Sequence, residues 1–323
     1  MAPDAHSGTN PPTAKRRRAA RMAPMATPTD VTFTSDRLTL AGHLRIPERA
    51  TGPLPALVFT GPLTGVKEQV AGSYADALAD AGYVTLAFDH RGFGASQGEP
   101  RQHEDPAGKL TDLRDALSWL AAHPAVDAER VGCVGVCLGG GYALRFAAFD
   151  PRVKALVTVA GGYNDPHAMQ AAMGPENYRN VLAGQMALAA RQQATGEVEY
   201  IAAVSDDDTP ALMAGAEPFD YYGTERSASP GWVNRMTQAS VYSLVTTDLA
   251  IGADFISPTP WLMVHGRSDD FCTPAGAEAT FARAGEPKEA LWLDTTNHID
   301  LYDVPKYVDP AVEAATAWLA RWL

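Results

Sequence analysis

The sequence has few cysteines, no long apolar run and an excess of acidic over basic residues. Only three of the 323 residues are cysteine, an odd number that suits free thiols in a reducing, cytoplasmic compartment better than disulfides. No apolar run approaches the ~20 residues of a membrane-spanning helix, so we expect no membrane partner. The formal net charge of −12 argues against a nucleic-acid partner. Metal-ligand spacings and nucleotide-binding loops are also missing, so we expect neither a metal nor another cofactor.

The first 30 residues differ in composition from the rest of the chain. They are rich in Ala, Pro and Thr, and they contain five basic but only two acidic residues. Because they show no apolar periodicity, we predict that residues 1–30 form a disordered basic tail. The arginines at 16–18 are not followed by the apolar segment of an export signal, and Met22 and Met25 are alternative starts.

Strand-like and helix-like segments alternate from residue 31 onward. The expected strands are 31–34, 38–46, 56–60, 84–88, 131–136, 153–159, 261–265 and 290–293, and the expected helices are 68–81, 110–122 and 312–323. Such alternation is typical of an α/β fold with a mainly parallel sheet and helices on both faces. We assign residues 31–162 and 251–323 to this core.

Residues 163–250 interrupt the alternation. This segment is rich in Met, Tyr, Trp and Asn and contains several helical stretches. We interpret it as a helical cap inserted over the carboxyl edge of the sheet, where it would shape a substrate pocket. The candidate pocket residues are Met213, Tyr221, Tyr222, Trp232 and Met236. The alternative is that these side chains pack inside the cap and do not face a substrate.

A nucleophile-elbow motif spans residues 135–139, Gly-Val-Cys-Leu-Gly. It follows an apolar strand-like run and leads into a helix-like segment, as the G-x-S-x-G elbow does, but its central residue is Cys137. An elbow strains its central residue, and Gly135 and Gly139 supply the small neighbours that this requires. The helix terminus after the elbow favours the reactive thiolate, so Cys137 is the candidate nucleophile.

An acid and a histidine follow Cys137 in the order that this architecture uses. Asp269 lies just after the strand 261–265, and His298 lies just after the strand 290–293. Both therefore fall at the carboxyl edge of the sheet, where they could orient and supply a general base for the thiol. Asp270 is the alternative acid because it is adjacent to Asp269.

An oxyanion hole requires two backbone N–H groups near the nucleophile. We expect one from Leu138, which follows Cys137, and the other from Leu63 in the loop after strand 56–60. Pro62 has no N–H to offer.

Four other candidate residues are expected to be structural. Cys133 lies inside a strand and Cys272 in a loop, and neither has an elbow around it. His90 lies in a loop that Asp89 and Arg91 would hold, and His265 lies at a strand end. We therefore assign packing or supporting roles to all four.

The chain after the tail resembles the α/β-hydrolase superfamily, and its cysteine elbow is similar to that of dienelactone hydrolases. A closer resemblance is to a capped group that includes bacterial dienelactone-hydrolase-like proteins and fungal polyketide acyltransferases. The residues that carry it are 65–69, 98–101, Cys137 with 139–143, 220–222, 234–235 and 298–303. Gly61 departs from the histidine that the group has in its oxyanion loop. The resemblance implies an α/β-hydrolase fold and acyl transfer or thioester chemistry.

These features predict an acyl hydrolase or acyltransferase that forms an acyl-cysteine on Cys137. Its substrate would be a small-molecule or carrier-bound ester, lactone or thioester, because thiolate attack on an unactivated amide tends to reverse. One alternative is a cyclase in which a nucleophile of the substrate itself attacks the acyl-cysteine. A second alternative is a binding protein that retains the fold without catalysis.

Overall fold

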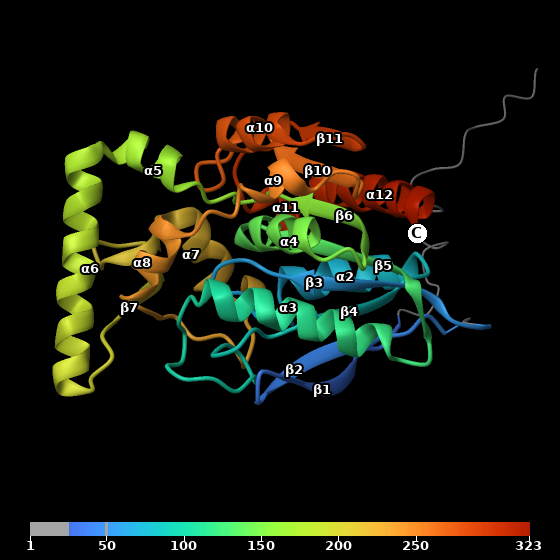
Figure 1. Ribbon diagram of the computed structural model, residues 1–323, viewed down its shortest axis with the longest axis horizontal. Helices are drawn as coiled ribbons and strands as arrows, with labels where there is room; N and C mark the ends of the chain where they lie inside the picture. The colour runs from blue at the N-terminus through green and yellow to red at the C-terminus, as the bar shows by residue number, and fades with distance from the viewer. Residues whose placement is uncertain (1–25, 49–50) are drawn as a thin grey trace, which may run out of the picture.

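An eight-stranded sheet lies at the centre of the computed structural model, which describes residues 26–48 and 51–323 (Figure 1). In spatial order the strands are β1 (Thr29–Ser35), β2 (Leu38–Arg45), β4 (Val84–Phe88), β3 (Leu54–Thr60), β5 (Val126–Val136), β6 (Val153–Val159), β10 (Trp261–Gly266) and β11 (Lys288–Leu293). β2 is antiparallel to both β1 and β4, and the pairs from β4 through β11 are parallel. The central strands are apolar runs buried on both faces, as in other parallel sheets.

Helices cover both faces of the sheet (Figure 1). One group, whose members all contact one another, comprises α2 (Val70–Asp80), α11 (Asp300–Asp303) and α12 (Pro305–Trp322). In a second group each helix contacts the next, in the order α3 (Pro106–Ala121), α4 (Leu138–Phe149), α9 (Gly252–Phe255) and α10 (Pro274–Arg283). This arrangement confirms the predicted α/β-hydrolase fold. It also brings the loops that follow β5, β10 and β11 to the same edge of the sheet.

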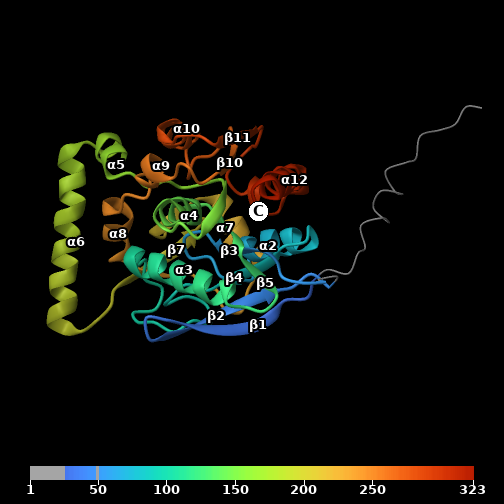
Figure 2. The ribbon, with the colours of Figure 1, turned by 45° about the vertical axis from the view of Figure 1, so that its right-hand side comes forward.

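The segment between β6 and β10 contains both helices and a small sheet. Its elements are α5 (Pro166–Met173), α6 (Pro175–Thr195), β7 (Tyr200–Ser205), β8 (Ala211–Ala214), α7 (Ala216–Tyr222), the 3-10 turn Glu225–Ser227, β9 (Met236–Thr237) and α8 (Ser240–Thr246). β7 pairs with β8 in parallel and with β9 in antiparallel orientation, a sheet that the sequence analysis did not anticipate. The long helix α6 stands along one side of the molecule beside α5 and α8 (Figure 2).

Several element boundaries differ from those expected. β1 begins at Thr29, so the predicted tail 1–30 overlaps the first strand; the rest of that prediction, with Met22 and Met25, falls outside the described residues. α3 begins at Pro106, four residues before the predicted start at residue 110. The reason is that Asp105 caps the helix by accepting a hydrogen bond from the Gly108 N–H. None of the described helices is both long and apolar enough to cross a membrane.

A buried carboxylate ties β1, the loop after β4 and α3 together. Asp112 accepts hydrogen bonds from the Ser35 hydroxyl at 2.8 Å and from the Arg91 backbone N–H and side chain at 2.8–3.0 Å. His90, which we expected to be structural, lies between Asp112 and Thr60. Burial opposes the charge of Asp112, but hydrogen bonds from His90 and Arg91 hold its pKa well below 3.8.

Asp112→Ala is expected to lower the free energy of unfolding by about 3–5 kcal/mol, because it leaves buried donors and a cation unpaired. Denaturant titration at pH 7 measures this, with Asp115→Ala on the same helix as the control, because Asp115 pairs with the exposed Arg114. A folded-state pKa below the unfolded one stabilises the protein above about pH 4, and this contribution is lost as the pH falls. The variant should therefore lose less stability on acidification than the parent. Equal losses for Asp112→Ala and Asp115→Ala would contradict the expectation.

Candidate active site

Cys137 occupies the turn between β5 and α4 in a strained conformation. Its φ of 56° and ψ of −129° lie in a region that non-glycine residues rarely adopt. A Cβ atom at Gly135 would overlap the Gly139 carbonyl, and one at Gly139 would overlap the carbonyl oxygens of Thr60 and Gly61. The two glycines are therefore required by the close packing of the elbow, as the motif predicts.

His298 and Asp269 form a buried hydrogen-bonded pair at the same edge of the sheet. His298 Nδ1 lies 2.6 Å from Asp269 Oδ2, and the other oxygen, Asp269 Oδ1, accepts the N–H groups of Phe271 and Cys272. Asp269 is only 6% exposed, whereas its neighbour Asp270 is exposed. Of the two candidate acids, the structure thus brings Asp269 to the histidine.

The Cys137 thiol and the His298 ring are neighbours. The sulfur and a ring nitrogen lie within 4.8 Å of each other, and Cys137 is 7% exposed. A hydrogen bond from Cys272 and the positive charge of His298 outweigh burial and hold the pKa of Cys137 well below 9. Burial opposes the charge of His298, but the Cys137 thiolate and Asp269 raise its pKa to about 10. Each of the two shifts favours the charged form of the other group, as in a thiolate–imidazolium pair.

A second thiol, Cys272, lies against the first. Its sulfur is 3.9 Å from that of Cys137, and it is buried in the loop between Asp269 and α10. The hydrogen bond with Cys137, burial and the charge of the neighbouring thiolate raise the pKa of Cys272, which favours its protonated form. We expected Cys272 to be structural, and the structure places it at the site instead. Together with Cys137 and His298 it could hold a metal ion.

Tyr302 is a further side chain at the site that the sequence analysis did not single out. Its hydroxyl lies 3.0 Å from His298 Nε2, so the imidazole is hydrogen-bonded through both nitrogens. Burial and the Cys137 thiolate raise the pKa of Tyr302, which keeps the phenol neutral. The spacing of four residues between His298 and Tyr302 is the sequence signal, because residues four apart meet across one helical turn.

The two candidate oxyanion donors lie on adjoining segments. Leu138 is the first residue of α4, so its N–H has no partner within the helix. Leu63 is buried in the loop after β3, whose carbonyls at Thr60 and Gly61 pack directly on Gly139. Their joint action on an oxyanion stays a prediction.

An aromatic cluster from the segment between β6 and β10 borders the histidine. Tyr221 and Tyr222 of α7 pack edge-on against Tyr302 with centroid distances of 4.9 and 6.4 Å, and Tyr222 stacks on Trp232. The Tyr222 hydroxyl is buried without a hydrogen-bond partner among the described residues. These three predicted pocket residues therefore lie near the candidate triad. The other two, Met213 and Met236, lie in the small sheet, on β8 and β9.

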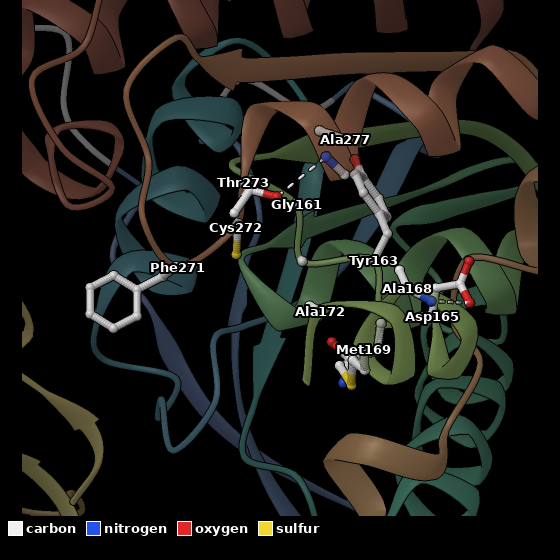
Figure 3. A pocket seen from close by; sticks show the side chains of 13 residues that line it. Gly161, Tyr163, Asp165, Ala168, Met169, Ala172, Phe271, Cys272, Thr273 and Ala277 are labelled. Atoms are coloured by element: carbon white, nitrogen blue, oxygen red, sulfur yellow. Dashed lines mark hydrogen bonds between the residues drawn. The ribbon is translucent and has the colours of Figure 1, made fainter. Parts of the chain in front are cut away.

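A cleft of about 230 Å³ opens beside Cys272 (Figure 3). Phe271 and Cys272 line it from the loop before α10, and Ala168, Met169 and Ala172 line it from α5. Because Cys272 touches Cys137, this cleft lies next to the candidate nucleophile. Small and apolar side chains make up much of its lining, and Asn164, Asp165 and Thr273 add polar groups.

Two more residues that we expected to be structural are buried within strands of the central sheet. Cys133 lies inside β5, where burial raises the pKa of its thiol. His265 lies at the end of β10, and Nδ1 is 2.9 Å from the Gly266 carbonyl. Burial lowers the pKa of His265, so it is neutral at pH 7.

Comparison with known proteins identifies the family. The family model described as X-Pro dipeptidyl-peptidase (S15 family) matches residues 36–300. The protein PA2218 of Pseudomonas aeruginosa is 32% identical over 82% of this chain and 73% of its own length. Its crystal structure superimposes with a TM-score of 0.84, covering 94% of this chain and 95% of that one.

Two fungal proteins are also similar. The polyketide transferase GrgF of a Penicillium species is 31% identical over 84% of this chain and 89% of its own length. The crystal structure of GrgF, an α/β hydrolase, has a TM-score of 0.78 and covers 91% of this chain and 98% of that one. The thiohydrolase AneE of Aspergillus aculeatus is 27% identical over 82% of this chain and 84% of its own. The chain therefore belongs to the X-Pro dipeptidyl-peptidase (S15) family, and it is an enzyme of the α/β-hydrolase type that resembles the polyketide transferases.

Proposed function

We propose that this enzyme transfers an acyl group from an activated thioester, ester or lactone through an acyl-cysteine on Cys137. The observation that carries the proposal is the buried arrangement of Cys137, His298 and Asp269 at one edge of the sheet. Nucleophile, base and orienting acid are the three parts that covalent acyl chemistry requires.

In the first half-reaction the Cys137 thiolate attacks the acyl carbonyl. The carbonyl oxygen becomes an oxyanion, which the N–H groups of Leu138 and Leu63 would stabilise. His298 gives its Nε2 proton to the leaving thiol or alcohol as the tetrahedral intermediate collapses to the acyl-cysteine. Asp269 stabilises the imidazolium before this step and fixes the ring orientation afterwards, because its carboxylate stays on Nδ1.

In the second half-reaction an acceptor attacks the acyl-cysteine. The neutral His298 removes a proton from water, an alcohol or an amine, and the Cys137 thiolate leaves. The burial of Cys137 supports transfer over hydrolysis, because little bulk water reaches the sulfur. The names of two relatives, polyketide transferase and thiohydrolase, support the same choice of an activated acyl donor.

Intact-protein mass spectrometry tests the proposal. The full chain is mixed with acyl thioesters, lactones, aryl esters and an X-Pro dipeptide amide, without an added acceptor. We expect the mass to rise by one acyl group with the thioesters, and peptide mapping to place this group on Cys137. The amide should give no adduct, because a thiolate is a better leaving group than an amine.

Three outcomes would contradict the proposal or redirect it. Turnover of the dipeptide amide with no thioester adduct would favour the peptidase activity of the family name. A cyclic product from a donor that carries its own hydroxyl or amine would favour the cyclase. Binding of the donors without any adduct or turnover would favour a non-catalytic role. In each case, prior alkylation of Cys137 with iodoacetamide serves as the blocked control.

A further inference from the structure

Three side chains with soft or borderline metal ligands meet at the site. Cys137 Sγ, Cys272 Sγ and a ring nitrogen of His298 all lie within 4.8 Å of one another, and all three residues are buried. They come from the elbow, from the loop before α10 and from the loop after β11. Thiolate sulfur and imidazole nitrogen are the ligands that Zn²⁺ prefers, and two cysteines with one histidine form a known open zinc set.

The distance between the sulfurs fits such a site. Zinc binds thiolate at about 2.3 Å in tetrahedral geometry, which separates two ligand sulfurs by about 3.8 Å. The two sulfurs here are 3.9 Å apart. The separation of the two sulfurs therefore already matches that of two thiolates on one zinc-type cation.

A carboxylate orients the ring of His298, as is usual for histidines that bind a metal. Its Nδ1 is bonded to Asp269, and a carboxylate on the far nitrogen of a ligating histidine fixes the tautomer and raises its basicity. The nitrogen left for a metal is Nε2, on which the Tyr302 hydroxyl now lies at 3.0 Å. A metal would replace that single hydrogen bond, and the fourth coordination position would remain for water or the hydroxyl.

We propose that Cys137, Cys272 and His298 form a binding site for a zinc-type divalent cation that competes with acylation of Cys137. The metal site itself does not depend on the proposed function; only its inhibitory consequence does. In the free protein Cys137 and His298 share one proton, and Cys272 carries another. Binding of the cation therefore forms two S–metal bonds and one N–metal bond and releases two protons to the buffer.

Cobalt titration of the reduced, metal-free full chain tests the site without any substrate. We expect one equivalent of Co²⁺ to give the visible bands of a tetrahedral ion and thiolate-to-metal charge-transfer absorption, and Zn²⁺ to displace it. Calorimetry of Zn²⁺ binding in buffers of different ionisation enthalpy should report about two protons released per ion.

Cys272→Ala and Cys133→Ala are matched variants, because both remove a buried thiol from the same chain. Cys133 lies within β5 and outside the cluster, so its variant should bind Zn²⁺ as the parent does. Loss of a partner that only hydrogen-bonds to a ligand lowers metal affinity by ~10–100-fold. Cys272→Ala removes a ligand itself, so its Zn²⁺ affinity should fall by more than that. Its cobalt complex should also lose about half of the charge-transfer intensity.

Equal Zn²⁺ affinity of the parent and Cys272→Ala would overturn the metal site, as would the absence of a tetrahedral cobalt spectrum. The acylation experiment gives an independent result. A protein that binds cobalt but forms no acyl adduct retains the metal site and refutes the proposed function. A protein that forms the adduct but binds no cobalt supports the proposed function and refutes the metal site. Adduct formation that saturating Zn²⁺ leaves unchanged would refute the competition.

Discussion

Replacing Cys137 with alanine is expected to lower kcat/KM for acyl thioesters by roughly 10⁴–10⁶-fold. The variant keeps the oxyanion donors, the His298–Asp269 pair and the aromatic cluster, but it loses the atom that becomes acylated. Because alanine retains Cβ, the strained turn at φ 56° is unchanged and the protein should fold. Steady-state assays with the best donor of the acylation panel, together with thermal unfolding of the variant, measure both effects.

The matched control for Cys137→Ala is Cys133→Ala, four residues earlier. Cys133 is fully buried in β5, and no reactive group of the site touches its thiol. We expect this control to retain turnover within a few-fold of the parent. If Cys137→Ala kept more than about a tenth of the parent activity, the acyl-cysteine mechanism would be excluded.

Replacing Asp269 with asparagine is expected to lower kcat by roughly 10³–10⁴-fold, by analogy with the aspartate of the serine protease triad. Asp269 Oδ1 accepts the N–H groups of Phe271 and Cys272, so the amide oxygen of asparagine will occupy that position. The amide NH₂ then faces His298 Nδ1, where it must donate. The ring is forced into the tautomer with its proton on Nε2, which cannot accept a proton from the thiol.

Asp270→Asn is the control for that substitution, because it makes the same chemical change one residue away on an exposed side chain. We expect its kcat to stay within about twofold of the parent, since exposed charges contribute little. The dependence of kcat on pH distinguishes the two aspartates. Asp269→Asn removes a carboxylate that raises the pKa of His298, so the step in the profile that reports His298 should move to lower pH, whereas Asp270→Asn should leave it in place. A large loss with Asp270→Asn and none with Asp269→Asn would overturn the assignment of the acid.

The strands and their shared edge could be predicted because their signals are local. Val153–Val159 and Trp261–Gly266 are short apolar runs that only a doubly covered sheet accommodates. Once these strands are parallel, residues just after them must meet at one edge, which is how Asp269 and His298 could be linked to Cys137. The catalytic roles of these three residues stay predictions.

The parts of the site that the sequence did not predict depend on loop paths. Cys272 reaches Cys137 because Asp269 accepts its N–H and turns the chain, and no composition or spacing encodes that turn. The three residues of the proposed metal site are likewise more than 20 residues apart, so no ligand-spacing motif exists to find. The four-residue spacing of His298 and Tyr302 is only a weak signal, because α11 begins after His298 and its four residues are too few to show a periodicity.

The small sheet of β7, β8 and β9 and the start of α3 were not predicted from the sequence, for other reasons. β9 has two residues and β8 has four, below the length at which alternation is visible. α3 begins at a capping pair, Asp105 and Pro106, rather than at the first apolar residue, Leu110, from which its start was predicted. Capping signals are therefore the better guide to where a helix begins in this chain.

The strained elbow also bears on how such enzymes diversify. The strain at Cys137 is a property of its backbone and Cβ, and the glycines around it make room for the main chain rather than for the sulfur. Serine and alanine share that Cβ, so the backbone accepts any of the three without rebuilding. A serine nucleophile is typical of the S15 family, and four of the six serine codons differ from a cysteine codon by one base. A lineage can thus exchange an oxygen for a sulfur in a single mutational event and keep the scaffold intact.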